Sequence, residues 1–420
     1  MSFLIAAPGS GSGKTTLTLG ILRALTLRGI AVRGAKSGPD YIDPRFHAAA
    51  CGRECFNLDA WAMSPERITT LAAGDVPLIV EGAMGLFDGA PPDGKGACAD
   101  LALELGLPVV LVVDASHMAQ SIAAVVAGFL NHNAALNFAG VILNKVGSER
   151  HEAMLKDALS PLNIAVLGTV FRHADVSRPS RHLGLVQAGE HPDLAAFLDG
   201  VASHVEASVD LDALTELLQP LDLPKRAKPL QPPAQTIAVA QDNAFAFAYP
   251  HILQDWSDAG AQIEVFSPLR NDTVPCADLV LLPGGYPELY AGQLASNSIF
   301  LDSLRAIAET KPIYGECGGY MVLGDTLTDA KGQTHAMAGL LRLETSFETR
   351  KLHLGYRALK AATGPFEGVW KGHEFHYATT LSAEGTPLFA AADATGNSLP
   401  PMGLVEGNVS GSFAHVIDRA

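Results

Sequence analysis

Short apolar segments alternate with longer helical stretches through the first half of the chain. Their apolar residues run continuously instead of alternating with polar ones, which predicts strands that are buried on both faces. Strands of this kind, separated by helices, are typical of a parallel sheet with crossover helices. The strands predicted in this α/β domain are residues 2–7, 31–35, 77–80, 108–113, 139–143 and 164–167.

A proline-rich segment interrupts this pattern. Residues 219–235 contain five prolines and follow neither a helical nor a strand period, which indicates a linker. The alternation then resumes, and the strands predicted after the linker are residues 236–240, 262–266, 279–282 and 312–314. We therefore expect two α/β domains, residues 1–218 and 236–420, joined by this linker.

Composition narrows the class of protein. With 420 residues, 48% hydrophobic and 17% charged, the chain can bury the cores of two or three domains, which excludes a small disulfide scaffold and a largely disordered protein. The 29 Lys and Arg against 44 Asp and Glu give 29 − 44 = −15, a charge that repels polyanions. We expect no nucleic-acid partner, although a local basic pocket could still bind a small anion.

The cysteines and the N-terminus bear on the compartment. The five cysteines are odd in number and scattered, which indicates reduced thiols, and Cys51 with Cys55 lacks a second pair to complete a zinc site. The first residues have no basic region, and their apolar run is too short for a signal peptide or a membrane span. These features predict a cytoplasmic protein without a membrane partner.

A candidate phosphate loop follows the first predicted strand. Residues 9–16 read GSGSGKTT and lead into a predicted helix. The loop N–H groups can converge on a phosphate, Lys14 can reach the β and γ phosphates, and the Thr15 hydroxyl can bind Mg²⁺. The usual spacing would place a glycine at Pro8, so the loop departs from the pattern at its first position. A flexible Gly/Ser turn is the alternative interpretation.

Carboxylates follow two of the predicted strands. Glu81 ends a buried strand at the sheet edge where ligands of open α/β folds bind, and we predict that it binds Mg²⁺. Asp88 lies in the glycine-rich loop that follows. Asp40 and Asp43 lie in the segment GPDYIDP, where each could bind metal, orient a substrate or cap a turn. The predicted metal ligands are Thr15, Asp43 and Glu81.

Asn144 ends another predicted strand. Its amide could bind an adenine edge or make a local backbone hydrogen bond, and the sequence leaves both open. The residues predicted to bind the nucleotide are Gly11, Gly13, Lys14, Thr15, Thr16 and Asn144.

The second domain carries a candidate nucleophile. Residues 311–321 form an apolar strand, a G-x-C-x-G turn and a helix start. This arrangement predicts that Cys317 is exposed at a helix N-terminus that favours its thiolate, whereas a buried packing cysteine is the alternative. The N–H groups of Gly285 and Gly318 are predicted to form an oxyanion hole. We predict that His415 is the base, with His376 as the competing candidate.

The phosphate loop, the segment PGGYPE (283–288) and the segment GECGGYM (315–321) together resemble the cobyrinic or hydrogenobyrinic acid a,c-diamide synthase family. The segments GPDYIDP (38–44), RHLGL (181–185) and GHEFHY (372–377) are also similar, so the resemblance spans nearly the whole chain. It implies a P-loop NTPase-like ATP domain of the dethiobiotin-synthetase type over residues 1–218. It also implies a class I glutamine amidotransferase domain, with a flavodoxin-like α/β fold, over residues 236–420.

The resemblance further implies a ligase of cobalamin biosynthesis. ATP and Mg²⁺ would activate the a and c acetate carboxylates of a corrin precursor as acyl phosphates, and ammonia from glutamine would attack them. By similarity, the roles are phosphate and metal for Lys14 and Thr15, metal for Glu81, adenine for Asn144, glutaminase nucleophile for Cys317 and base for His415.

Four other functions stay open at this point. They are a cobyric acid synthase, a nickel-sirohydrochlorin a,c-diamide synthase, a regulatory P-loop ATPase with a non-catalytic second domain, and a ligase whose glutaminase half has decayed. The expected partners are a corrinoid polycarboxylate, glutamine and ATP, and a homodimer is allowed. The residues suggested to meet the substrate are Asp40, Tyr41, Arg45, Asp88, Arg178, Arg181 and His182.

One element of the glutaminase site is missing from the sequence. In many class I amidotransferases an acid stands two residues after the catalytic histidine, but here Ile417 occupies that place. An imidazole without an acidic partner is a weaker base, so we expect slow glutaminase turnover. The sequence does not choose among three carboxylates that could support His415: Glu316, Glu374 and Asp418.

Overall fold

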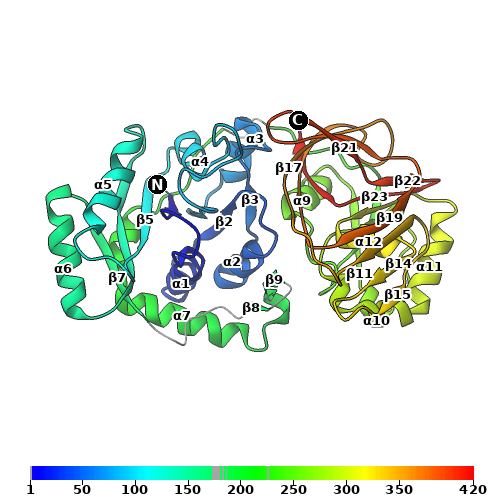
Figure 1. The fold of residues 1–420 in the computed structure, drawn as a ribbon. Helices are drawn as coiled ribbons and strands as arrows, with labels where there is room; N and C mark the ends of the chain where they lie inside the picture. The colour runs from blue at the N-terminus through cyan, green and yellow to red at the C-terminus, as the bar shows by residue number, and fades with distance from the viewer. Residues whose placement is uncertain (1, 173–179, 182–183, 186, 225–226) are drawn as a thin grey trace. The chain divides into compact units, whose positions relative to one another are not determined.

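The computed structural model divides into two compact units, residues 1–227 and 228–420, coloured blue to green and green to red in Figure 1. The division lies inside the proline-rich segment. The structure describes residues 2–172, 180–181, 184–185, 187–224 and 227–420.

The first unit is built on a seven-stranded sheet with the order β3-β2-β4-β1-β5-β6-β7, in which every neighbouring pair is parallel. Residues of central strand β1 are at most 1% exposed, so both faces of the sheet are covered. The strands are β1 Phe3–Ala6, β2 Arg33–Ser37, β3 Phe56–Leu58, β4 Leu78–Glu81, β5 Val109–Asp114, β6 Phe138–Val146 and β7 Val166–Phe171. Only the three-residue β3 was not predicted, because it is too short for a pattern to stand out.

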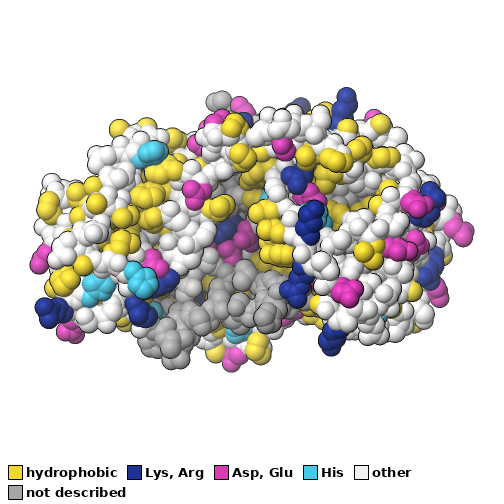
Figure 2. Space-filling model, viewed as in Figure 1, with side chains coloured by type: hydrophobic (Ala, Val, Ile, Leu, Met, Phe, Trp, Pro, Cys, Tyr) yellow, Lys and Arg dark blue, Asp and Glu magenta, His cyan; other side chains and the backbone are white. Residues whose placement is uncertain are grey.

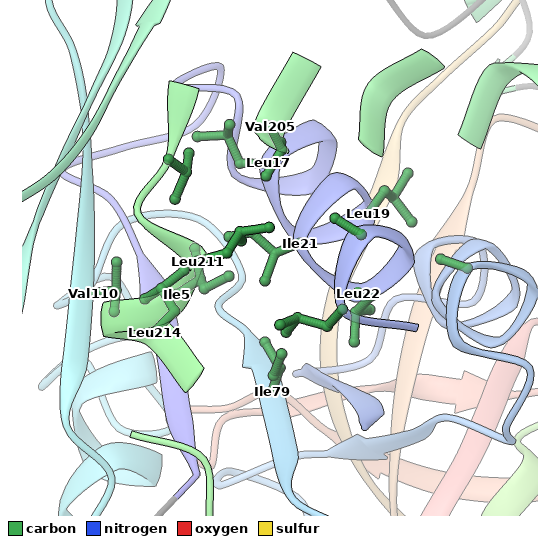
Figure 3. Close-up of a cluster of buried hydrophobic side chains, with 14 of the residues drawn as sticks. Ile5, Leu17, Leu19, Ile21, Leu22, Ile79, Val110, Val205, Leu211 and Leu214 are labelled. Carbon is green, nitrogen blue, oxygen red and sulfur yellow. The ribbon is translucent and has the colours of Figure 1, made fainter. Parts of the chain in front are cut away.

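Helices cover this sheet. Helix α1 begins directly after the phosphate loop and packs against α2 and α7. Its apolar residues Ile21 and Leu22 face Ile5 and Ile79 of the sheet in one buried cluster (Figure 3). The helices are α1 Lys14–Leu27, α2 Asp43–Cys51, α3 Pro65–Ala72, α4 Cys98–Leu105, α5 Ile122–His132, α6 Glu149–Leu159, α7 Leu194–Ser208 and α8 Leu211–Glu216. The two-residue strands β8 Ser180–Arg181 and β9 Gly184–Leu185 pair antiparallel.

The second unit contains a six-stranded sheet with the order β11-β10-β12-β13-β23-β22. Its first five strands are parallel in the flavodoxin-like order 2-1-3-4-5, and β22 is an antiparallel edge strand. The strands are β10 Thr236–Ala240, β11 Gln262–Phe266, β12 Leu279–Leu282, β13 Ile313–Glu316, β22 Leu404–Glu406 and β23 Val409–Ser412. The helices are α9 Pro250–Asp258, η4 Pro268–Arg270, η5 Pro287–Leu289, α10 Ala291–Ser296, α11 Ser298–Ala308 and α12 Gly318–Leu323. The α/β fold class predicted for both domains is confirmed.

Two further, mainly antiparallel sheets complete this unit and were not predicted. Their strands mix buried and exposed residues, so they lack the continuous apolar runs on which the prediction rested. One sheet contains β14 Thr326–Thr328, β15 Thr334–Ala336, β16 Arg342–Ser346 and β19 Thr379–Glu384. The other contains β17 His353–Ala361, β18 Gly368–His376, β20 Phe389–Ala392, β21 Ser398–Met402 and β24 Ala414–Arg419.

Among the described residues, no helix has both the length and the apolarity needed to cross a bilayer. On the face seen in Figure 2, acidic and basic side chains are scattered between apolar and uncharged ones.

Candidate active sites

The phosphate loop connects β1 to α1 and is held from beneath by the end of β6. Gly11 and Gly13 have φ values of 80° and 88°, which glycine adopts without steric cost. Asn144 Nδ2 donates to the Ser12 carbonyl at 2.8 Å, and Lys145 Nζ donates to the Gly11 carbonyl at 2.8 Å. These bonds turn loop carbonyls toward the sheet and leave the loop N–H groups to face a phosphate.

The hydrogen bonds of Asn144 bear on its two predicted roles, an adenine contact or a local backbone hydrogen bond. Its Nδ2 binds the loop, and its Oδ1 accepts from the Lys145 N–H at 2.9 Å. The side chain therefore makes the local backbone hydrogen bond that the sequence allowed, to Lys145, and a second one to the distant Ser12, while an adenine contact stays a prediction.

Lys14 is the first residue of α1 and is buried. Its Nζ donates to the carbonyls of Gly9, at 3.3 Å, and Met84. Burial lowers the pKa of this lysine, because desolvation disfavours the charged form. A phosphate group would offer the ammonium a stronger, charged acceptor than these carbonyls.

The predicted metal ligands lie together at the carboxyl end of the sheet. Thr15 Oγ1 lies 3.4 Å from Asp43 Oδ2 and hydrogen-bonds Glu81 Oε1. Both carboxylates are buried. These hard oxygen donors fit the coordination preference of Mg²⁺.

Two residues of this cluster were missed by the sequence reasoning. Lys36 Nζ lies 2.8 Å from Asp43 Oδ2 and 2.7 Å from Glu81 Oε1. His47 Nε2 lies 2.6 Å from Glu81 Oε2. A lysine in a buried strand, five positions before Tyr41 in the GPDYIDP segment, was the available signal for a buried ion pair.

The electrostatics of this cluster favour charged groups. Burial disfavours charge on Lys36, but the neighbouring Asp43 and Glu81 carboxylates outweigh it and raise the lysine pKa. Burial likewise opposes ionisation of Glu81, yet Lys36 and the His47 hydrogen bond hold the Glu81 pKa below its usual value. The first site is therefore a compensated set of buried ions.

The nearby substrate candidates have local structural contacts. Asp40 Oδ1 accepts from the N–H groups of Ile42 and Asp43 at 2.8 and 2.9 Å, so it caps the turn before α2. Asp88 Oδ2 accepts from the Gly85 N–H at 2.9 Å. Tyr41 is buried, and burial also lowers the pKa of the Arg45 guanidinium. Arg178, His182 and the side chain of Arg181 lie outside the part of the chain that the structure describes.

Cys317 sits at the turn between β13 and α12. Its φ of 46° lies in the left-handed region that a non-glycine residue enters rarely, as expected for a nucleophile at a sharp strand-to-helix turn. The expectation of an exposed thiol is wrong, because Cys317 is only 4% exposed. Burial, reinforced by the Glu288 carboxylate, raises the thiol pKa well above its usual value. The helix N-terminus does not offset this desolvation.

Gly284, Gly285 and Gly318 lie where the turn that carries Cys317 approaches His415. A methyl group on Gly284 would lie 2.7 Å from His415 Nε2 and 3.3 Å from Cys317 Cβ, and one on Gly318 would lie 3.0 Å from the Gly285 nitrogen. The imidazole and the cysteine thus border one small space, which only glycine leaves open. The Gly285 nitrogen lies close to Gly318, the residue after Cys317, and the oxyanion hole is predicted in this region.

The two candidate bases have different surroundings. His415 is completely buried, and burial lowers its pKa to about 3, so the imidazole is neutral and able to accept a proton. His376 Nε2 binds Glu374 Oε1 at 2.9 Å, and its ring stacks on Phe413 at a centroid distance of 3.9 Å. The ring that borders Gly284 and Cys317 is that of His415.

Comparisons with known proteins cover both units. The family of the CobQ/CobB/MinD/ParA nucleotide binding domain matches residues 3–186. The family of the CobB/CobQ-like glutamine amidotransferase domain matches residues 236–419. The chain thus carries a nucleotide-binding domain followed by a glutamine amidotransferase domain.

Relatives match along the whole chain. The hydrogenobyrinate a,c-diamide synthase of Brucella anthropi is 53% identical and covers 99% of this chain and 98% of its own. Those of Brucella abortus and Rhodobacter capsulatus are 54% and 52% identical, with 99% and 98% of this chain covered and 98% of each relative. Identity of this extent, across both sites, shows that the chain belongs to the hydrogenobyrinate a,c-diamide synthase family.

Proposed function

We propose that this protein is an ATP- and glutamine-dependent ligase that amidates the a and c acetate carboxylates of hydrogenobyrinate in cobalamin biosynthesis. The observation that carries the proposal is the presence, in one chain, of a phosphate loop beside buried metal-type oxygens and of a strained cysteine beside a neutral histidine. The full-length relatives, all named for this substrate, support the corrinoid assignment.

The first unit would activate the substrate. A carboxylate has no leaving group and must first be activated. Its oxygen attacks the γ-phosphorus of ATP, and the bond from that phosphorus to the bridging oxygen breaks. ADP departs and an acyl phosphate is formed. Lys14 and the loop N–H groups would stabilise the charge on the transferred phosphoryl group. Thr15, Asp43 and Glu81 are the residues that would hold Mg²⁺, which supplies further neutralisation of phosphate charge when bound.

The second unit would supply nitrogen. His415 accepts the Cys317 proton, and the thiolate attacks the glutamine side-chain carbonyl to form an intermediate whose oxyanion would be bound by Gly285 and Gly318. The protonated His415 gives its proton to the leaving nitrogen, so ammonia and a thioester form. Water then hydrolyses the thioester to glutamate and restores the thiol.

The two reactions meet at the acyl phosphate. Ammonia attacks the acyl carbon, inorganic phosphate leaves, and loss of a proton from nitrogen gives the amide. Ammonium is not a nucleophile, so neutral ammonia produced from glutamine is the useful form. One glutamine and one ATP are consumed for each carboxylate, and two carboxylates require two cycles.

Mass spectrometry of tetrapyrroles after incubation with ATP, Mg²⁺ and glutamine tests this proposal. We expect hydrogenobyrinate to undergo two successive conversions of an acid to an amide, with ADP and glutamate formed in step. Parallel reactions with cobyrinate, its a,c-diamide and nickel-sirohydrochlorin distinguish the three related amide-forming synthases. ATP hydrolysis without amidation of any of these substrates would contradict the proposal and favour a regulatory ATPase.

A further inference from the structure

The position that usually carries the triad acid has another structural use in this chain. Lys371 of β18 pairs with Asp418 and Gly372 pairs with Val416, so Ile417 is the extra residue of a β-bulge in β24. The Ile417 side chain is completely buried, and its carbonyl lies 2.9 Å from His251 Nε2. An acid for His415 therefore has to come from another element.

Glu374 is engaged by other side chains. Its Oε2 accepts from Arg357 Nη2 at 2.7 Å and Nε at 2.9 Å, and its Oε1 lies 2.9 Å from His376 Nε2. Both oxygens thus bind cationic or ring N–H groups of β17 and β18. This carboxylate orients His376 rather than His415.

Asp418 lies on the same strand as His415 but beyond the bulge. Its Oδ1 accepts from the Arg419 N–H at 2.8 Å, and its backbone pairs with Lys371. These contacts tie Asp418 to the end of β24, beyond the bulge.

Glu316 is the carboxylate that reaches His415. Its Oε2 lies 3.6 Å from His415 Nδ1, and its Oε1 accepts from the Val416 N–H at 3.0 Å. The second bond fixes the carboxylate to the strand that carries the histidine. The first distance is in the range of an ion pair, and a shift of about half an ångström converts it to a hydrogen bond, as catalytic contacts often tighten when substrate binds.

The surroundings make this pairing consequential. Glu316 is 7% exposed and His415 is completely buried, and a small apolar pocket lined by Tyr249, Trp256 and Phe366 borders the carboxylate. Charge interactions are strong in such a setting because water does not screen them. Burial raises the Glu316 pKa to about 8.

We propose that Glu316 is the acid of a Cys317–His415–Glu316 triad, supplied by the residue immediately before the nucleophile instead of the second residue after the histidine. Glu316 is a positioning residue. Its carboxylate accepts the Nδ1–H of His415, which leaves the Nε2 lone pair to take the Cys317 proton, and it stabilises the imidazolium that results. This inference rests on the proposed glutaminase role of Cys317.

The Glu316→Gln variant of the full chain tests the proposal, because Gln keeps the shape and the acceptor for Val416 but removes the negative charge. We expect kcat for glutamine hydrolysis to fall about 10²-fold while KM for glutamine stays within about threefold. Amidation driven by added ammonium should be unchanged. Glu316→Asp should recover part of the loss, because it restores the charge.

Asp418→Asn is the matched control, since it neutralises a buried carboxylate on the strand of His415, and it should change glutamine hydrolysis by no more than about twofold. Glutamine hydrolysis within about threefold of wild type in Glu316→Gln would overturn the proposal, as would an equal loss with ammonium, which would assign Glu316 to packing. Absence of amidation by the wild-type protein with both nitrogen sources would instead overturn the proposed function.

Discussion

The two candidate sites differ in the charge state of their buried groups. In the first unit, Lys36, Asp43 and Glu81 are buried as ions that compensate one another. In the second unit, burial drives Cys317 and His415 toward their neutral forms. A site for phosphate and metal needs fixed charges, whereas a buried nucleophile is held neutral until it reacts.

This difference predicts how substitutions in each site affect stability and activity. Removing one charge from the first site leaves the others uncompensated, so stability and activity fall together. Removing a neutral group from the second site leaves no stranded charge, so activity falls alone. The predictions below separate these two behaviours.

The largest effect is expected for Cys317→Ser. Glutamine-dependent amidation should fall by at least about 10³-fold, because the nucleophile is lost, whereas synthesis with added ammonium at raised pH should continue. Product formation with each nitrogen source is the measurement, and Cys276→Ser, at an exposed cysteine of the same unit, is the control. Equal loss with both nitrogen sources would show that Cys317 is structural.

Lys14→Ala should lower amidation with either nitrogen source by about 10²- to 10³-fold, because a donor to the transferred phosphoryl group is removed. Basal glutamine hydrolysis should persist, since it takes place in the second unit. ADP and glutamate release measure the two halves separately, with Lys156→Ala on the exposed face of α6 as control. Amidation at the wild-type rate would refute the nucleotide assignment.

Lys36→Met should destabilise the first unit by about 3 kcal/mol in the absence of Mg²⁺, because Asp43 and Glu81 lose their buried counter-charge. Added Mg²⁺ should restore part of this stability if these carboxylates bind it. Denaturant unfolding with and without Mg²⁺ is the measurement.

Lys145→Met is the matched control for this change, because it breaks the Lys145–Asp114 pair, whose side chains are 39% and 29% exposed. A pair of this exposure should contribute no more than about 1 kcal/mol. Equal losses in the two lysine variants, or no response of Lys36→Met to Mg²⁺, would contradict a compensated ion cluster that also holds metal.

The smallest effect concerns pH. With the Glu316 pKa near 8, the ionised carboxylate, and hence glutamine hydrolysis, should rise about tenfold between about pH 7 and pH 9. Glu316→Gln should flatten this rise. The other titratable groups near Glu316, His415 and Cys317 are Glu288, Tyr314, His373, Glu374 and His376.

The same carboxyl affects stability with a definite sign. Because its pKa is raised from 4.5 to about 8 on folding, the folded state binds the proton more tightly, and this contribution to stability is lost as the pH rises through that window. Glu316→Gln should therefore melt with less pH dependence between these values. If glutamine hydrolysis by Glu316→Gln still rises between about pH 7 and pH 9, the group that titrates in this range is not Glu316.

The sequence predicted the parallel strands of both units except β3 and β23, because strands buried on both faces leave continuous apolar runs. The antiparallel strands of the second unit were missed, since half-exposed strands such as β17 mix burial along their length. The phosphate loop and the cysteine turn were found from local spacing, because their backbone conformations depend on nearby glycines.

What the sequence alone determined is thus local: the loop of Lys14, the turn of Cys317 and the strands that present them. Only the tertiary structure decided that Lys36 and His47 join the acids of the first site, that Cys317 is buried, and that Glu316 reaches His415. These contacts join residues far apart in the chain, and desolvation depends on everything packed around a group. The residues next to a side chain in the sequence therefore determine neither its partner nor its exposure to water.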